Sequence, residues 1–413
     1  KRLYPAQSVE DVQRLVRSQP RIKVLGTRHC FNHIADSDHS VLSLASMNEV
    51  VRLDTDTEKA RRSPTVTISG GMSYGQLCPF LHEQGFALSN LASLPQISVA
   101  GACATATHGS GEKNGNLATS VSALEMVTAT GEVINVSRQA DGDTFRAMVV
   151  GLGCFGVITK LTLDLQPTFR MRQLVYENLP LSELLTNFDA IQASGYSVSL
   201  FTDWQDKKID RVWIKSRIQH GEGAKEFKAE PEFFSARLAT QNLHPISGFP
   251  SENCTEQMGA PGPWHERLPH FRMGFLPSAG DELQSEYFVR RHHAAEAILA
   301  VERLRDKITP HLLVTEIRAI AADDLWLSPC YERPSIAIHF TWKQNWKEVK
   351  QVLPLIEREL APFSARPHWG KLFTMSRSQL KLLYEKLPEF VQLSNQFDPS
   401  GKFRNEFLNT YVF

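Results

Sequence analysis

The chain has 413 residues, and its 45 Lys and Arg balance its 45 Asp and Glu, so its formal net charge is zero. A neutral chain offers no electrostatic reason to expect nucleic acid or an anionic membrane as a partner, and no apolar run approaches the roughly 18 residues of a membrane span. The 23 Phe, 8 Tyr and 7 Trp exclude disorder, and the length predicts two or three domains or one large domain.

The six cysteines are scattered and none forms a CxxC pair, which excludes a zinc knuckle or a thioredoxin-type site. Scattered cysteines in a chain of this length indicate buried free thiols in a reducing compartment. Arg2, Asp11 and Arg14 interrupt any apolar run near the start, so no signal peptide is visible there. We therefore expect a cytoplasmic protein.

The first elements in chain order alternate between helix and strand. Ser8 opens a predicted helix, and the strand that follows ends at Gly26. A second strand is predicted over 65–69, because its apolar residues alternate with polar ones. After it, Ser73 and Gln76 have the spacing of a capping box, which predicts the start of another helix.

Residues 98–111 break this pattern, because 11 of the 14 are Gly, Ala, Ser or Thr. Such a segment cannot build a core by itself, but it lets the backbone approach a large ligand closely. His108 is a bulky side chain within it, and two interpretations stay open: it caps backbone carbonyls, or it points at a ligand.

Residues 151–156, GLGCFG, match the dinucleotide fingerprint G-x-G-x-x-G letter for letter. That fingerprint needs a strand before it and a helix after it. Here residues 143–150 predict a helix and residues 160–165 predict a strand, so the context is reversed. We therefore expect a tight glycine turn beside a cofactor rather than a Rossmann NAD site.

The order of the predicted elements changes after about residue 170. Residues 281–308 predict a strand followed by a long helix, and 345–363 predict a further helix. A polar segment covers 219–232, and the proline-rich residues 244–280 predict an ordered loop. Four more strands are predicted, over 196–204, 210–218, 312–320 and 335–342.

Two of these strands carry pairs of polar residues on one face. Glu316 and Arg318 are two residues apart, as are His339 and Thr341, so each pair points to the same side of its strand. A solvated face with a surface ion pair explains the pattern as well as a polar pocket does. The pocket would suit a substrate rich in hydroxyl groups.

Two further segments hold candidate residues with simple structural explanations. His29 follows a strand and a glycine, where a loop histidine is the simpler interpretation. In RPHWGK, Trp369 would be a core residue and Lys371 a solvated lysine.

Seven short motifs, in the same order along the chain, resemble one family and span about residues 4 to 410. GTRHCFN (26–32), SLPQISVAGACATATHGSG (93–111), GCFGVIT (153–159) and HWGK (368–371) resemble the vanillyl-alcohol-oxidase type of flavoprotein. The remaining three are similar to the alditol oxidases, also called xylitol or sorbitol oxidases: residues 253–272, 316–329 and 339–342.

The resemblance implies an FAD cofactor bonded covalently to His29 through its 8α-methyl carbon. Cys30 and Arg28 stand where the family often has Ser and Gly, and neither change removes the imidazole nucleophile. Residues of the small-residue segment would cradle the pyrophosphate, and Gly156 and Val157 would lie by the adenine. The implied cofactor positions are Gly26, Thr27, Arg28, His29, Cys30, Ser93, Ser98, Gly101, Thr105, Ala106, Thr107, His108, Gly156 and Val157.

The resemblance also implies a reaction, in which the terminal C1 hydroxyl of an alditol is oxidised and oxygen is reduced to hydrogen peroxide. His339 is our candidate for assisting proton removal, and Lys371 would stabilise negative charge near the flavin N1–C2=O edge. Arg318 acts with these two as the third catalytic candidate. The implied substrate-binding positions are Ser93, Glu316, Arg318, Thr341 and Lys371.

We therefore expect an α+β flavoprotein of the two-domain PCMH type. Its FAD-binding domain would cover 1–167, its substrate or cap domain with a large antiparallel sheet 168–365, and its C-terminal segment 366–413 would complete the FAD domain. Expected partners are a polyol and oxygen, with no metal, no nucleic acid and no membrane, in a monomer. Two alternatives are a sugar-1,4-lactone oxidase or dehydrogenase of the same fold, and a flavoprotein that serves only as a scaffold.

Overall fold

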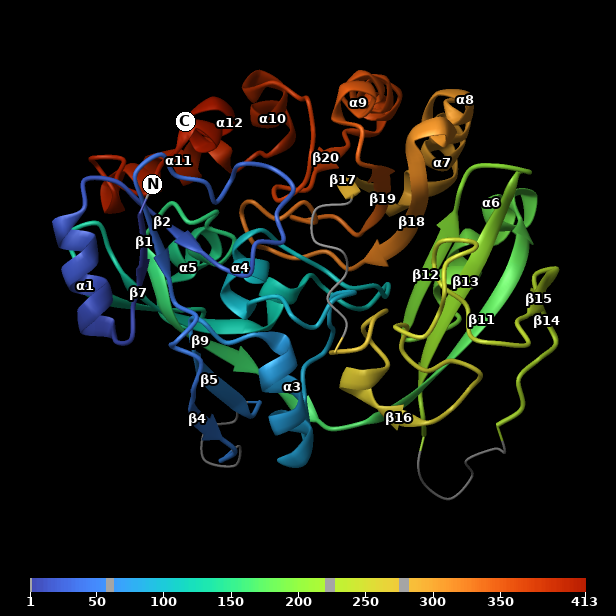
Figure 1. Ribbon diagram of the computed structural model, residues 1–413, viewed down its shortest axis with the longest axis horizontal. Coiled ribbons are helices and arrows are strands. Elements are labelled where there is room, and N and C mark those ends of the chain that lie inside the picture. Colours follow the sequence, from blue (N-terminus) through green and yellow to red (C-terminus); the bar gives the residue numbers. More distant parts are fainter. Residues whose placement is uncertain (1, 57–62, 220–226, 275–281) are drawn as a thin grey trace.

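The computed structural model describes residues 2–56, 63–219, 227–274 and 282–413. Its elements form two parts that lie side by side (Figure 1). One holds the N-terminal helices and smaller sheets together with the last helices, and the other holds one large sheet and its covering helices. Of the predicted loops, 220–226 and 275–280 lie outside the described residues.

The first part contains a parallel sheet, an antiparallel sheet and a two-stranded ladder. The parallel sheet has the order β1 (Arg2–Pro5), β3 (Ser40–Ser43), β2 (Ile22–Leu25). The antiparallel sheet has the order β4 (Val50–Asp54), β5 (Thr65–Ser69), β9 (Val157–Asp164), β7 (Val121–Val127), β8 (Val133–Ser137). The ladder joins β6 (Phe86–Ala87) to β10 (Gln166–Pro167).

The helices of this part begin where the sequence predicts. α1 (Val9–Ser18) starts after Ser8, whose side chain accepts a hydrogen bond from the Asp11 amide. α3 (Tyr74–Glu83) starts with both bonds of the predicted capping box between Ser73 and Gln76. Two shorter helices follow, α4 (Val99–Ala104) and α5 (Gly142–Val149).

The context of GLGCFG is reversed, as predicted. α5 precedes the glycines and β9 follows them. A Cβ on Gly156 would lie 2.4 Å from the Val127 carbonyl oxygen, so this glycine allows the turn to pass close to β7. The fingerprint is therefore a tight turn and has no Rossmann context.

The second part is a ten-stranded sheet in which every pairing is antiparallel, as expected. β16 (Gly262–Pro263) pairs with β11 beside the main path. The order is β14 (Glu232–Phe233), β15 (Ala236–Leu238), β11 (Arg170–Pro180), β13 (Lys208–Arg217), β12 (Ser197–Thr202), β18 (Leu312–Ile320), β19 (Ser335–Lys343), β17 (Glu282–Arg290), β20 (Arg366–Pro367).

Three helices pack against strands of this sheet: α6 (Leu181–Gln192), α7 (Ala294–Glu302) and α9 (Trp346–Leu360). The short helix α8 (Arg305–Ile308) follows α7. The Tyr287 hydroxyl of β17 donates to Glu357 of α9 at 2.9 Å, so this side chain points toward the helices. Successive strand residues point to opposite faces, so Glu286 points away from the helices.

The single long helix predicted before residue 308 is wrong. The chain forms α7 and α8 instead, because the Leu304 amide bonds the Val301 carbonyl three residues back and tightens the turn between them. The tightened turn brings the chain to β18, which begins at Leu312.

The last helices, α10 (Arg377–Leu383), α11 (Leu387–Phe397) and α12 (Glu406–Tyr411), return to the first part (Figure 1). The Ile22 amide donates to the Lys402 carbonyl at 3.0 Å, and the Asn405 side chain donates to the Ile34 carbonyl at 3.1 Å. The predicted domain limits at 167 and 365 stay predictions.

Candidate active site

The loop that holds His29 is fastened to the segment that holds Lys371. The Phe31 amide donates to the Gly370 carbonyl at 2.8 Å. The Asn32 side-chain amide donates to the carbonyls of Trp369 and Lys371, each at 2.7 Å. Two motifs from opposite ends of the sequence therefore form one corner of the site.

The small-residue segment joins the same region. The Ser98 amide donates to the Thr27 hydroxyl at 3.1 Å, which ties the segment to the His29 loop. The Gly111 amide donates to the Ala319 carbonyl of β18 at 2.9 Å, which ties its other end to the large sheet. The segment thus bridges the two parts of the molecule at the site.

The residues around Ser98 fit a bound cofactor. A Cβ on either Gly26 or Gly101 would lie 2.7 Å from the Ser98 hydroxyl oxygen, so the two glycines keep a cradle open that any side chain would fill. Residues 26–30 are exposed, so the cradle opens on a surface that a bound ligand can cover.

The other predicted cofactor positions lie along the same segment. Thr107 and Thr105 approach each other through their hydroxyl oxygens at 3.4 Å, and Ala106 between them has φ 55°. The Leu152 amide donates to the Ala104 carbonyl at 3.1 Å, which places the turn before Gly156 and Val157 against the end of α4. The predicted adenine end therefore adjoins the predicted pyrophosphate segment.

Glu286 of β17 lies at the centre of a buried polar network. It accepts hydrogen bonds from Lys371 at 2.6 Å, from Arg318 at 2.7 Å and from His108 Nε2 at 3.1 Å. Although burial raises the pKa of this carboxyl, the charges of Lys371, His108 and Arg318 hold it well below its ordinary value. Glu286 is therefore ionised and joins the small-residue segment, β18 and the C-terminal segment.

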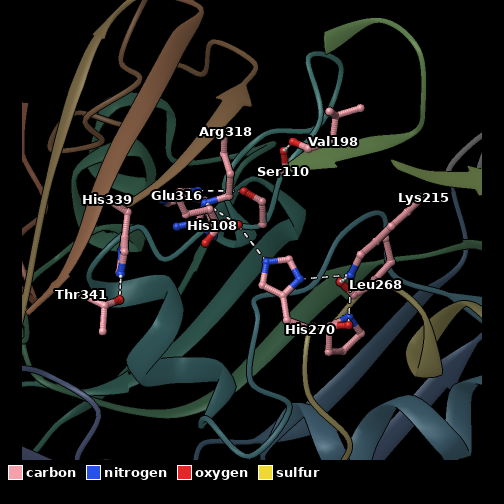
Figure 2. Close-up of polar contacts among 12 residues, drawn as sticks. His108, Ser110, Val198, Lys215, Leu268, His270, Glu316, Arg318, His339 and Thr341 are labelled. Carbon is pink, nitrogen blue, oxygen red and sulfur yellow. Dashed lines mark hydrogen bonds and ion pairs between the residues drawn. The ribbon is translucent and has the colours of Figure 1, made fainter. Parts of the chain in front are cut away.

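Glu316 forms the second acidic centre, on β18, which β19 separates from β17 (Figure 2). It accepts a hydrogen bond from His270 Nε2 at 2.8 Å and lies 3.5 Å from Arg318 Nε. Burial raises its pKa, but Arg318 and His270 lower it below its ordinary value overall. Arg318 thus lies between two carboxylates, and these partners raise its pKa against the effect of burial.

His339 is held in one tautomer by its two neighbours. Lys371 donates to His339 Nδ1 at 2.6 Å, so Nε2 carries the hydrogen that faces the Thr341 hydroxyl at 3.0 Å. Burial and the Lys371 charge lower the pKa of His339 to about 4, so the ring is neutral at pH 7. Figure 2 shows His339 and Thr341 side by side.

The structure decides between the interpretations that the sequence left open. Glu316, Arg318, His339 and Thr341 are each at most 7% exposed, so the solvated sheet face is wrong. Trp369 is fully buried, as predicted, whereas Lys371 is largely buried and paired rather than solvated. The Ser93 carbonyl accepts from the His270 amide at 3.0 Å, which places this predicted position beside Glu316.

Sequence reasoning missed Glu286, His270 and Lys215. Glu286 carried a usable signal, because it is a lone acidic residue in the predicted apolar strand SEYFV. His270 and Lys215 carried none, because a proline-rich loop and a strand each tolerate such residues on their surface.

Across the described ranges, no group of three or more His, Cys, Asp or Glu is arranged to hold a metal ion. Among the helices that the structure describes, none is both long enough and apolar enough to cross a membrane.

Comparison with protein families identifies two parts of the chain. The FAD binding domain family matches residues 2–137, and the D-arabinono-1,4-lactone oxidase family matches residues 281–411. A crystal structure of cholesterol oxidase from B. sterolicum superposes with a TM-score of 0.78 over 100% of this chain and 94% of that chain. At 14% sequence identity this likeness concerns the fold alone, and it confirms the predicted α+β architecture.

Curated relatives narrow the family. The alditol oxidase of Streptomyces sp. (strain IKD472 / FERM P-14339) is 46% identical over 92% of this chain and 88% of its own length. The L-gulonolactone oxidase of Mus musculus is 28% identical over 97% of this chain and 92% of its own length. This chain therefore belongs to the alditol oxidase family of FAD-dependent oxidoreductases.

Proposed function

We propose that this enzyme oxidises the terminal C1 hydroxyl of an open-chain alditol, such as xylitol or sorbitol, to the aldose. The carbon gives up a hydride, the hydroxyl gives up a proton, and both electrons pass finally to oxygen, which becomes hydrogen peroxide. The observation that carries the proposal is the buried row of donors and acceptors on β18 and β19, where Glu316, Arg318 and Thr341 lie together. A row of hydroxyls on an extended substrate can bond to each of them in turn.

FAD supplies the acceptor for the hydride and the route of the electrons to oxygen when it is bound. The residues that would hold it are the His29 loop, the cradle around Ser98 and the turn at Gly156. Burial lowers the pKa of His29, which keeps its imidazole neutral and nucleophilic. This supports a covalent bond between His29 and the flavin.

The proton of the substrate hydroxyl passes to Nδ1 of the neutral His339 ring, whose lone pair becomes free when the Lys371 ammonium turns its N–H from Nδ1 to the substrate oxygen. Lys371 keeps its own proton, because it is paired with the ionised Glu286. Arg318 fixes the substrate oxygen, and Lys371 also stabilises negative charge that develops during the transfer.

A lactone oxidase is the second candidate, because the family model over 281–411 carries that description. The identities favour the alditol: 46% to the alditol oxidase against 28% to the L-gulonolactone oxidase. A pure scaffold is disfavoured, because Glu286 and Glu316 are buried charges whose desolvation a scaffold has no reason to retain. We take the polyol and oxygen as partners of a cytoplasmic monomer.

The first prediction concerns the substrate. Peroxide formation is measured as kcat/KM with xylitol, sorbitol, glycerol, 1,2-hexanediol and an aldonolactone. We expect kcat/KM for xylitol and sorbitol to exceed kcat/KM for glycerol and 1,2-hexanediol by at least about tenfold. A site that bonds several hydroxyls leaves its own polar groups unpaired when the substrate lacks them. A lactone that surpasses xylitol overturns the alditol assignment in favour of the lactone oxidase.

The second prediction concerns His29. After acid precipitation the flavin absorbance should stay with the wild-type protein, and His29→Ala should release it into the supernatant. Cys30→Ser is the matched control, because it alters the next residue and leaves the imidazole in place. Flavin that leaves the wild-type protein on precipitation contradicts the covalent bond.

A further inference from the structure

We propose that His270, oriented by Lys215, is a positioning residue that holds Glu316 ready for a substrate hydroxyl remote from the reacting carbon. The inference rests on the proposed function. It assigns the selectivity for polyols to two residues that were not among the predicted site residues. Both are fully enclosed, with His270 5% exposed and Lys215 1% exposed.

His270 connects the two sides of the predicted substrate site. Its Nε2 donates to Glu316 Oε1 at 2.8 Å, while its backbone amide donates to the Ser93 carbonyl at 3.0 Å. One residue therefore sets the carboxylate on the sheet and the loop that faces it. Figure 2 shows the ring between Glu316 and Lys215.

Two aromatic rings that also contact each other pack against the His270 ring. Trp213 meets it edge to face at 5.1 Å and 79°, and Phe201 meets it at 5.5 Å and 70°. Phe201 is also the strand partner of Glu316 across β12 and β18. The ring therefore has little freedom to rotate away from the carboxylate.

Lys215 fixes which nitrogen of His270 carries the hydrogen. Burial lowers the pKa of Lys215 to about 7, and in its ammonium form it donates to the Leu268 carbonyl at 2.6 Å, to the Pro269 carbonyl at 3.0 Å and to His270 Nδ1 at 3.2 Å. Three partners use all three of its N–H donors. With Nδ1 accepting, the hydrogen stays on Nε2, where it holds Glu316.

This arrangement sets the orientation of the Glu316 carboxylate, which binds a substrate hydroxyl. Glu316 has two anchors, His270 on one side and Arg318 on the other. Without His270 the carboxylate turns wholly toward Arg318, which weakens both groups as partners for a substrate hydroxyl. A substrate without the remote hydroxyls does not use this contact.

Two variants of His270 separate this role from simple anchoring of the loop. His270→Gln places an amide donor near the former Nε2, so it keeps the bond to Glu316 and loses the acceptor for Lys215. His270→Asn places an acceptor near the former Nδ1, so it keeps Lys215 and loses Glu316. His265→Gln, five residues earlier in the same segment, is the matched control, since this half-buried ring contacts His82 and Trp264 instead.

The readout is kcat/KM for xylitol divided by kcat/KM for 1,2-hexanediol, with melting temperatures as a check on folding. We expect His270→Asn to lower the ratio about tenfold, which is the size of one hydrogen bond to a charged group, while His270→Gln and His265→Gln stay within about threefold of wild type. The ratio for Lys215→Met should lie between those of His270→Asn and His270→Gln, because the His270 ring loses its orientation but keeps its Nε2 donor.

Other outcomes overturn the proposal. If Asn preserves the ratio and Gln loses it, His270 only anchors the loop; if Lys215→Met matches wild type, Lys215 does not orient the ring. If the wild-type enzyme oxidises xylitol but the ratio of the two kcat/KM values is unchanged in every variant, this inference alone is refuted. A wild-type enzyme that forms no peroxide from xylitol or sorbitol refutes the proposed function, and this inference with it.

Discussion

At the scale of single residues, the site depends on carboxylates that are buried and ionised. Removing one partner of a buried ion pair is costly, because the other charge then lacks compensation in a medium of low polarity. Glu286 has Lys371, Arg318 and His108 as partners, so its loss affects three functional groups at once.

The third prediction concerns Glu286→Gln. We expect the free energy of unfolding at pH 7 to fall by about 3–5 kcal/mol, measured by urea titration. The pKa of Glu286 is lowered on folding from the ordinary 4.5, so its contribution is present above pH 4.5 and is lost as the pH falls through the folded value. The difference in the free energy of unfolding between the wild-type protein and Glu286→Gln should therefore decrease as the pH is lowered below 4.5.

Glu357→Gln is the control for this prediction. Glu357 is a buried glutamate too, but burial raises its pKa, so its shift has the opposite sign. A gap between wild type and Glu286→Gln that stays constant down to about pH 3 would show that the ionised form of Glu286 is not what stabilises the fold.

At the scale of elements, much of the structure could be predicted because its signals are local. Capping at Ser8 and Ser73, and the alternation of polar residues on β18 and β19, identified helices and a shared face from a few neighbouring residues. The break between α7 and α8 could not be predicted, because no Gly or Pro marks it. Glu286 stands out locally as an acidic residue in an apolar strand, but its role could not be predicted, because its three partners come from three distant segments.

The fourth prediction concerns the cradle between β2 and α4. Gly101→Ala places a Cβ 2.7 Å from the Ser98 hydroxyl oxygen, which must move into the space meant for the cofactor. We expect the purified protein to carry less flavin per chain, measured as the ratio of absorbance at 450 and 280 nm, on the order of half or less. Adding Ser98→Ala should restore it, since the clash is with the hydroxyl alone.

Gly274→Ala is the matched control, because a Cβ there meets no atom of the described residues within 4 Å. Equal flavin content in Gly101→Ala and Gly274→Ala would show that the cradle around Ser98 is not filled by the cofactor.

At the scale of the whole molecule, the site exists only where the two parts meet. The large sheet supplies Glu286, Glu316 and Arg318, while the first part supplies the His29 loop. Asn32 joins the His29 loop to the Lys371 segment through two hydrogen bonds at 2.7 Å.

The fifth prediction concerns Asn32→Ala. Two carbonyls lose their donor, so the free energy of unfolding should fall by about 1–3 kcal/mol, and covalent flavin per chain should fall with it. Asn187→Ala is the control, because its side chain bonds only one turn back, to Glu183. If both variants retain full flavin, the Asn32 hydrogen bonds are not needed to hold the cofactor.

The bond from Asn32 to Lys371 spans 339 residues, and this separation has a consequence for the order of assembly. A ribosome adding on the order of 5–20 residues per second exposes the His29 loop many seconds before its partner segment is made. Contacts of such long range also form late in folding. If His29 bonds the flavin as proposed, the attachment follows completion of the polypeptide, because the segment that fastens the His29 loop is made last.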